Sequence, residues 1–169
     1  MRSPHTKNLS TRLSSSLSGV ALCLAALPTG AALAADMGTT VSAPTVAERL
    51  SLAREAIKVS DFKKAQSELR LAAREAPRNA DVHNLLGYSL RKQATPDLPK
   101  AFEQYTIALK LNPNHRGAHE YIGEAYLVDK NPAKAEEHLA QLQSICGNTS
   151  CEEYQDLAKS IADYKAKNQ

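Results

Sequence analysis

The sequence predicts an all-α protein, an α-solenoid (αα-superhelix) in which three helix hairpins stack in a row and one more helix covers the C-terminal end. Three observations lead to this prediction. The chain is 43% hydrophobic but only 5% aromatic, with seven glycines, and its apolar content comes mainly from Ala and Leu, which are good helix formers. One residue pattern recurs along the chain, and its apolar positions follow helical spacing.

An internal repeat with a basic period of 34 residues occupies most of the chain beyond residue 45. Equivalent small residues lie 34 or 36 positions apart, and both longer intervals contain the segment 87–101. We therefore place a two-residue insertion within 93–96. The equivalent positions are Leu52-Ala53, Leu86-Gly87 and Ile122-Gly123; Ala65, Ala101 and Ala135; Leu69, Tyr105 and Leu139; Ala72, Ala108 and Leu142; and Pro77 and Pro113. Small residues here let paired helices approach closely, and hairpins must stack because one alone cannot bury its apolar face.

Six helices are expected within the repeats. Their expected ranges are 46–59, 62–75, 80–93, 98–111, 116–129 and 132–145. Thr45 followed by Glu48 predicts a capping box at the first helix, and Asn79 is a suitable N-cap for the third. Pro77 and Pro113 lie just beyond expected helix ends, where proline cannot continue a helix.

A seventh helix is expected in the C-terminal segment 150–169. Tyr154, Leu157 and Ile161 fall on one face of it, which predicts a cap that buries this face against the last hairpin and leaves its polar face in water. Ser150 with Glu153 matches a second capping box.

The N-terminus has the pattern of a cleaved export signal over residues 1–34. Residues 1–12 carry three positive charges, residues 17–27 are mostly apolar, and Ala32-Leu33-Ala34 supplies the small residues of a cleavage site. Residues 35–45 contain several turn formers and predict a flexible tail. We expect a bacterial protein of the periplasm or one that is secreted, without a stable membrane anchor after cleavage.

Charge gives no argument for a nucleic-acid partner. The predicted leader contains three basic residues and no acidic ones, so cleavage leaves 18 basic against 18 acidic residues. The two ends of the remaining chain differ slightly: residues 35–79 carry eight basic and six acidic side chains, and residues 116–169 carry six and nine. Such a difference could orient a charged ligand, although solvated helix faces produce gradients of this size by chance.

The repeated residues resemble the tetratricopeptide repeat family, whose pattern is W-x2-L-G-x2-Y followed by A-x3-F-x2-A-x4-P. The resemblance implies repeats at 46–79, 80–115 and 116–149. The second repeat matches at His83, Leu86, Gly87, Leu90, Ala101, Tyr105, Ala108 and Pro113, and the third at His119, Ile122, Gly123, Tyr126, Ala135, Leu139 and Leu142. The departures are Arg49, His83 and His119 at the usual Trp position, and Gly147 where the third repeat would have Pro.

In this family the first helix of each hairpin lines a concave face that generally binds a peptide or another protein. Transferred by repeat register, the residues implied to bind a partner are Leu50, Arg54, Lys58, Asp81, Asn84, Tyr88, Arg91, Glu120, Glu124 and Leu127. The carboxylate clamp of the chaperone-binding members is absent, because Leu50 and Arg54 stand where it has Lys and Asn.

We therefore expect a non-enzymatic scaffold of the bacterial envelope that binds an extended segment or a helix in the concave groove. The alternative is a structural module that associates with itself, its groove filled by another copy or by its own N-terminal tail. A redox or metal-dependent protein ranks third.

Cys146 and Cys151 are the cysteines that remain after loss of the leader, which contains Cys23. An even number in an exported chain predicts a disulfide. Their spacing differs from the C-x-x-C of redox-active pairs, and no thioredoxin-like βαβ pattern surrounds them.

No metal, other cofactor or catalytic group is expected. His115 and His119 are one helical turn apart, but His119 holds the same inner repeat position as His83, so both are interpreted as packed side chains. His138 is expected to be solvated on an outer face. The chain has no phosphate-binding glycine loop and no H-E-x-x-H motif.

Overall fold

The computed structural model describes residues 42–168. The predicted signal peptide, residues 1–34, lies outside this range, as does most of the predicted tail. The described residues contain seven α-helices and no strand. These are α1 (Val46–Lys58), α2 (Phe62–Glu75), α3 (Ala80–Lys92), α4 (Leu98–Leu111), α5 (Arg116–Val128), α6 (Pro132–Cys146) and α7 (Glu152–Lys167). The all-α prediction is confirmed, and each repeat helix agrees with its expected range to within one residue.

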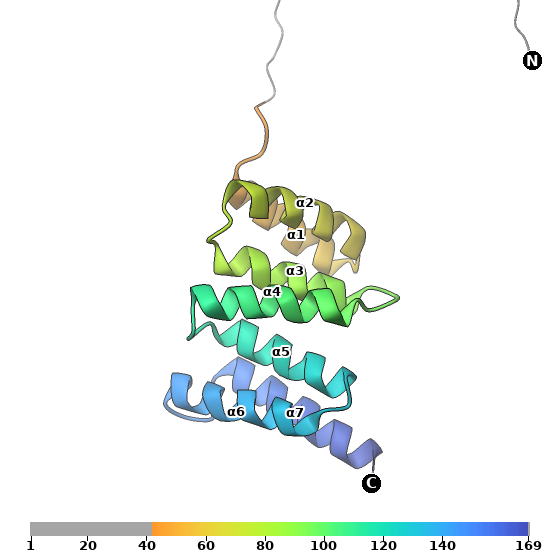
Figure 1. Ribbon diagram of the computed structural model, residues 1–169, viewed down its shortest axis with the longest axis vertical. Coiled ribbons are helices and arrows are strands. Elements are labelled where there is room, and N and C mark those ends of the chain that lie inside the picture. The colour runs from red at the N-terminus through yellow and green to blue at the C-terminus, as the bar shows by residue number, and fades with distance from the viewer. Residues whose placement is uncertain (1–41, 169) are drawn as a thin grey trace, which may run out of the picture. The chain divides into compact units, whose positions relative to one another are not determined.

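The helices form three consecutive hairpins, α1–α2, α3–α4 and α5–α6, which stack in chain order, with α7 packed on the last (Figure 1). Helix α3 contacts α1 and α5, and α5 contacts α7. The first helix of each hairpin and α7 therefore form one layer, whose exposed side we call the inner face. Helices α2, α4 and α6 form the outer layer.

Local signals explain most helix boundaries. At α1 the Thr45 hydroxyl accepts a hydrogen bond from the Glu48 N–H at 3.3 Å, and the Glu48 carboxylate accepts from the Thr45 N–H at 2.7 Å. The Asn79 side chain caps α3 as predicted. The turn between α3 and α4 spans residues 93–97, whereas the other two hairpin turns have three residues each, which confirms the two-residue insertion.

The predicted capping box at Ser150 and Glu153 is wrong. Helix α7 begins one residue later than that box requires, with Cys151 as its N-cap residue and no side-chain capping hydrogen bond. The Ser150 hydroxyl instead donates to Asn148 Oδ1 at 2.7 Å. A short turn held by Asn148 and by the bond from Cys146 to Cys151 therefore precedes the helix.

The buried core has two parts. The first joins α1 to α5, and its largest fully buried side chains include Leu69, Val82 and Tyr105. The second contains Leu127, Ala135, Leu142, Leu157 and Ile161, with Tyr154 packed against it. Because Leu157 and Ile161 come from α7, this helix buries the apolar face predicted for it against the last hairpin.

Two inner-layer glycines permit close helix contacts. A Cβ atom on Gly87 would lie 2.7 Å from the Tyr105 ring, and one on Gly123 would lie 2.6 Å from a Leu157 methyl group. Real Cβ atoms essentially never come this close to another heavy atom. The small residues inferred from the repeat thus allow helices to pack where a side chain would not fit.

The predicted disulfide is present between Cys146 and Cys151, with a Cα–Cα distance of 6.3 Å. It joins the last residue of α6 to the residue before α7. Gly147 ends α6 in the left-handed conformation (φ 70°), which glycine adopts without a steric penalty. The turn and the disulfide together fix where α7 begins.

The usual Trp position of each repeat carries a polar side chain with a partner on the second helix of its hairpin. Arg49 forms ion pairs of 3.0 Å with Glu68 and with Glu75. His83 Nε2 lies 3.0 Å from the Pro77 carbonyl oxygen, and His83 Nδ1 lies 2.9 Å from the Gln104 side chain. Both Arg49 and His83 are 7% exposed, so burial is accompanied by hydrogen bonding.

The third repeat pairs two histidines, which corrects the expectation that His138 is solvated on its own. His119 Nδ1 lies 2.9 Å from His138 Nδ1, and His119 Nε2 lies 2.9 Å from the Pro113 carbonyl oxygen. Since a carbonyl only accepts, neutral His119 carries its proton on Nε2, and His138 donates from Nδ1. Burial, followed by the neighbouring His119, lowers the pKa of His138 to about 4.

Candidate partner-binding face

Tyr88 and Arg91 on α3 and Glu120, Tyr121 and Glu124 on α5 come together in the middle of the inner face, and we call these five residues the inner-face centre. The Tyr88 and Tyr121 rings lie 4.7 Å apart between centroids. The Arg91 guanidinium lies 5.4 Å and 6.0 Å from these two centroids, within the range of a cation–π contact. The result is an aromatic pair with a cation beside it.

Arg91 is only 7% exposed, so its side chain mainly contacts other residues of the protein. It forms an ion pair with Glu124, and its Nε donates to the Tyr105 hydroxyl at 3.4 Å. Desolvation lowers the pKa of Arg91, but the nearby Tyr105 and Glu124 raise it overall. Glu124 also accepts a hydrogen bond from the Ser160 hydroxyl at 3.2 Å. Arg91 and Glu124 therefore connect α3, α5 and α7 through mutually compensated charges.

Glu120 is the acid of the inner-face centre whose charge is not compensated. It is partly buried and has no hydrogen-bond or ion-pair partner among residues 42–168. Burial raises the pKa of Glu120 to about 8, and the nearby carboxylates Glu124, Asp156 and Glu153 add to the increase. These neighbours come from α5 and α7, so the C-terminal half of the inner face is acidic.

Asn84 lies beside this acidic region, between α3 and α5. Its side chain is 5% exposed, and its Nδ2 would lie 3.2 Å from a Cβ atom on Gly117, one helical turn before Glu120. Asn84 Oδ1 is buried and has no hydrogen-bond partner within the described part of the chain. A buried amide oxygen without a partner is uncommon, because desolvation costs about 1–3 kcal/mol unless a hydrogen bond compensates for it.

Of the other implied binding residues, three are exposed on the inner layer. Arg54 and Asp81 form a long ion pair of 3.9 Å between α1 and α3. Asp81 also accepts from His115 Nε2 at 3.0 Å. Lys58 pairs at 2.7 Å with Glu55 on its own helix. Because these contacts are largely exposed, they leave the side chains available to a ligand.

Leu50 and Leu127 lie deeper than the repeat register implied. Each is 8% exposed and belongs to the hydrophobic core. Leu127 shares its part of the core with Leu157 and Ile161 of α7, so the capping helix covers it. Both leucines stabilise the packing and offer little surface for a partner.

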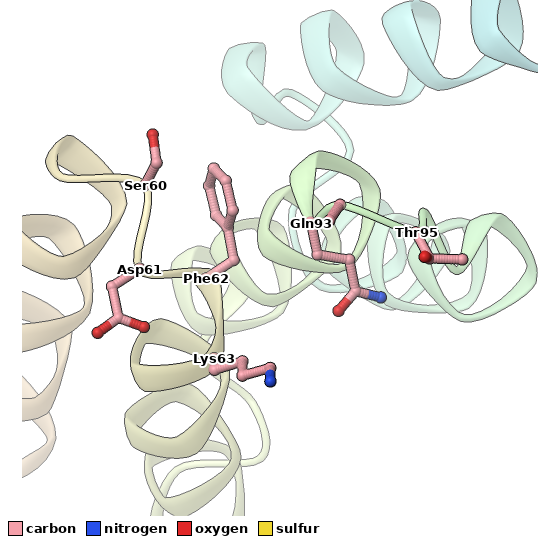
Figure 2. A pocket seen from close by; sticks show the side chains of 7 residues that line it. Ser60, Asp61, Phe62, Lys63, Gln93 and Thr95 are labelled. Atoms are coloured by element: carbon pink, nitrogen blue, oxygen red, sulfur yellow. The ribbon is translucent and has the colours of Figure 1, made fainter.

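Two aromatic residues that the sequence analysis did not select belong to the same surface. Tyr121 is part of the inner-face centre, and Phe62, the first residue of α2, lies 6.4 Å from Tyr88 between ring centroids. Phe62 also lines a cleft of about 630 Å³ between the two hairpin turns that flank it, together with Lys63 and Gln93 (Figure 2). The signals that could have found them were Tyr121 in the middle of a predicted inner helix, next to Glu120, and Phe62 at the first position of the helix expected over 62–75.

Residues 42–168 contain no group of three or more His, Cys, Asp or Glu side chains placed to hold a metal ion. Within the same range, no helix combines the length and the apolar character needed to cross a membrane.

The sequence matches the family model of the tetratricopeptide repeat over residues 50–103 and 97–148. The chain belongs to the tetratricopeptide repeat family. Members of this family are generally non-enzymatic scaffolds for protein interactions. A search of curated protein sequences found no significant match to the chain.

Solved structures share the fold at low sequence identity. The TPR2B domain of yeast Sti1, solved as a complex with pHsp70, is 18% identical over 72% of this chain and 97% of that chain, with a TM-score of 0.64. The Yersinia enterocolitica type III secretion translocator chaperone SycD is 15% identical over 77% and 98%, with a TM-score of 0.63. A chain of the CopN–Scc3 complex is 19% identical over 73% and 70%, with a TM-score of 0.56.

Proposed function

We propose that this protein is an exported, non-enzymatic scaffold that binds an extended segment of a partner protein across its inner face. The observation that carries the proposal is the inner-face centre, where Tyr88 and Tyr121 form an aromatic surface beside polar groups from α3 and α5. Aromatic side chains near the middle of an interface often contribute most of its binding energy.

The buried Asn84 supports binding of an extended backbone. Its unpaired Oδ1 can accept a hydrogen bond, and each extended residue other than proline offers a backbone N–H donor. Asn84 Oδ1 is closed to solvent in the free protein, so a peptide N–H would reach it once the Asn84 amide turns toward the inner face. The hydrogen bond would then offset the desolvation cost of this oxygen.

Two observations support export, the leader pattern of residues 1–34 and the disulfide between Cys146 and Cys151. Disulfides persist in oxidising compartments such as the periplasm. Cell fractionation followed by N-terminal sequencing tests this part, and a mature chain that begins at Ala35 is expected.

Site-specific photocrosslinking in living cells tests the binding face. A benzophenone amino acid replaces Tyr88 in one variant and Gln143, an exposed residue of α6, in the control. We expect a crosslinked partner protein from position 88 and none from position 143, because only position 88 lies on the inner face.

Adducts from position 143 alone would contradict the proposal. An adduct between two copies of the chain from position 88 would instead favour the self-associating module, and the mass of the protein in solution would then show a dimer or larger assembly.

A further inference from the structure

Resting on the proposed function, we propose that the inner-face centre receives a Lys or Arg side chain of the extended partner segment, with Glu120 as its counter-ion and the Tyr88–Tyr121 pair beside its stem. The fold of a peptide-binding scaffold does not determine which ligand charge it prefers. That preference depends on the charges of the side chains on α3, α5 and α7.

Glu120 is placed to receive a cation. On α5 it comes one helical turn before Glu124, which pairs with Arg91, and directly before Tyr121, whose ring lies 4.7 Å from that of Tyr88. Arg91, the nearest cation of the centre, is already paired with Glu124. An incoming basic group would therefore find Glu120 unpaired and partly dehydrated, where a charge-assisted hydrogen bond is stronger than in water.

The surrounding charges favour the same ligand. The groups that face Glu120 are Glu124 on α5, Glu153 and Asp156 on α7, and Tyr88 and Arg91 on α3. Glu153 lies 3.4 Å from Arg116, so Arg91 and Arg116 are both engaged with carboxylates. A third cation, Lys92, has its Nζ 6.0 Å from the Tyr88 ring centroid, on the α3 side of the aromatic pair. An acidic ligand residue would face repulsion here, whereas a basic one would be attracted.

The orphaned amide of Asn84 is a second, independent sign of a ligand. Its side chain is 95% buried and packs against Gly117, on the turn of α5 that precedes Glu120. Asn84 Oδ1 can only accept a hydrogen bond, and a peptide N–H next to the basic residue would supply the donor once the buried amide turns toward the inner face. The Glu120 carboxylate and Asn84 Oδ1 thus both lack a hydrogen-bond donor.

A peptide library tests the proposal. Nonapeptides with random sequence, acetylated at the N-terminus and attached through a C-terminal amide, carry no terminal charges. They are selected at pH 8.5 on the wild-type protein, on Glu120→Gln, and on Glu103→Gln as a control that removes an exposed carboxylate from the outer helix α4. We expect Lys or Arg to be enriched about tenfold at one position on the wild type and the control, and not on Glu120→Gln.

The Glu120→Gln variant should fold, because Gln has the shape of the neutral carboxyl form that burial favours at this position; a thermal melt verifies this. Peptides selected without a basic preference, or with a preference that Glu120→Gln leaves unchanged, would overturn the proposal while the peptide-binding function stands. Selection of no peptide at all would overturn both.

The pH dependence of binding gives a second readout. Only ionised Glu120 attracts a cation, and its pKa in the free protein is raised to about 8. The affinity for a selected Arg peptide should therefore rise about tenfold or more between pH 6 and pH 9, since Arg itself does not titrate in this range. In Glu120→Gln the affinity should change little with pH, and an equal rise in both proteins would contradict the role of Glu120.

Discussion

The second and third hairpins share a glycine at the same repeat position, but different parts of the chain pack against it. Gly87 of the second hairpin is covered by Tyr105 from its own second helix. In the third hairpin the residue equivalent to Tyr105 is the smaller Leu139, and Gly123 is covered by Leu157 from α7. The second hairpin thus covers its glycine with a side chain of its own, whereas the glycine of the third hairpin is covered by a helix outside the repeats.

A chain that ends at Gly147 tests this difference most severely. Loss of α7 would expose Gly123, Leu127 and Leu142, which pack with Leu157 and Ile161. We expect a loss of roughly 3–5 kcal/mol in the free energy of unfolding, as for removal of large buried side chains, and aggregation. Thermal melting and light scattering measure both. A soluble truncated protein with the melting temperature of the full chain would show that the third hairpin is self-sufficient.

Replacement of Cys146 and Cys151 by Ser loosens the attachment of α7 without removing it. A disulfide that closes so short a loop should contribute about 2 kcal/mol in the chain-entropy model. Chemical denaturation measures this loss, and thiol titration of the denatured, unreduced wild type should find no free thiol. Two titratable thiols in the protein recovered from cells would contradict the pairing seen in the structure.

Substitution of Gly87 or Gly123 by alanine compares the two glycine contacts directly. At Gly87 the new Cβ would press on the fully buried ring of Tyr105, which cannot move aside. The expected overpacking cost of roughly 1–3 kcal/mol exceeds the gain of about 1 kcal/mol in helix propensity.

At Gly123 the Cβ would meet the methyl groups of Leu157, which is also fully buried. Leu157 belongs to α7, the last helix of the fold, so a small outward shift of this helix can relieve the contact. We expect stability within about 1 kcal/mol of the wild type, because the same two effects nearly cancel there. Denaturant unfolding of both variants is the measurement. If Gly123→Ala lowered the free energy of unfolding more than Gly87→Ala, the contact with α7 would be the more rigid of the two.

His138→Gln gives the third hairpin a pair like His83 and Gln104 of the second. The pKa of His138 is lowered to about 4 in the folded protein, below its ordinary value of about 6.5. Folding is therefore favoured above pH 6.5, and this contribution is lost as the pH falls toward 4. After allowance for the partial exposure of the ring, the wild type should lose about 1 kcal/mol more than the variant over this range.

The difference between the two proteins is the quantity to measure, by denaturant unfolding at several pH values. Glu120 acts with the opposite sign, because its raised pKa favours the folded state at low pH, but it is common to both proteins. If the stability of wild type and variant depended equally on pH, folding would not lower the pKa of His138.

The positions of the helices could be predicted because repeats provide several independent copies of the same pattern. The depth of individual side chains could not. Repeat register places Leu50 and Leu127 on the inner helices, but α7 covers Leu127 and the first hairpin packs Leu50 into its core. Register also cannot foresee contacts between helices that depend on side-chain reach, such as His119 with His138 or Arg91 with Glu124.

The three polar pairs at the usual Trp position make the repeats chemically unequal. Arg49 requires two carboxylates, His83 an amide and a carbonyl oxygen, and His119 a second imidazole. An exchange of first helices between hairpins would leave each of these groups beside the wrong partner. Substitutions at these positions should therefore occur together with substitutions at Glu68, Gln104 and His138 in related sequences. A designed array that duplicates residues 80–115 would retain a matched His–Gln pair in every copy, with Pro113 of one copy supplying the carbonyl oxygen for the next.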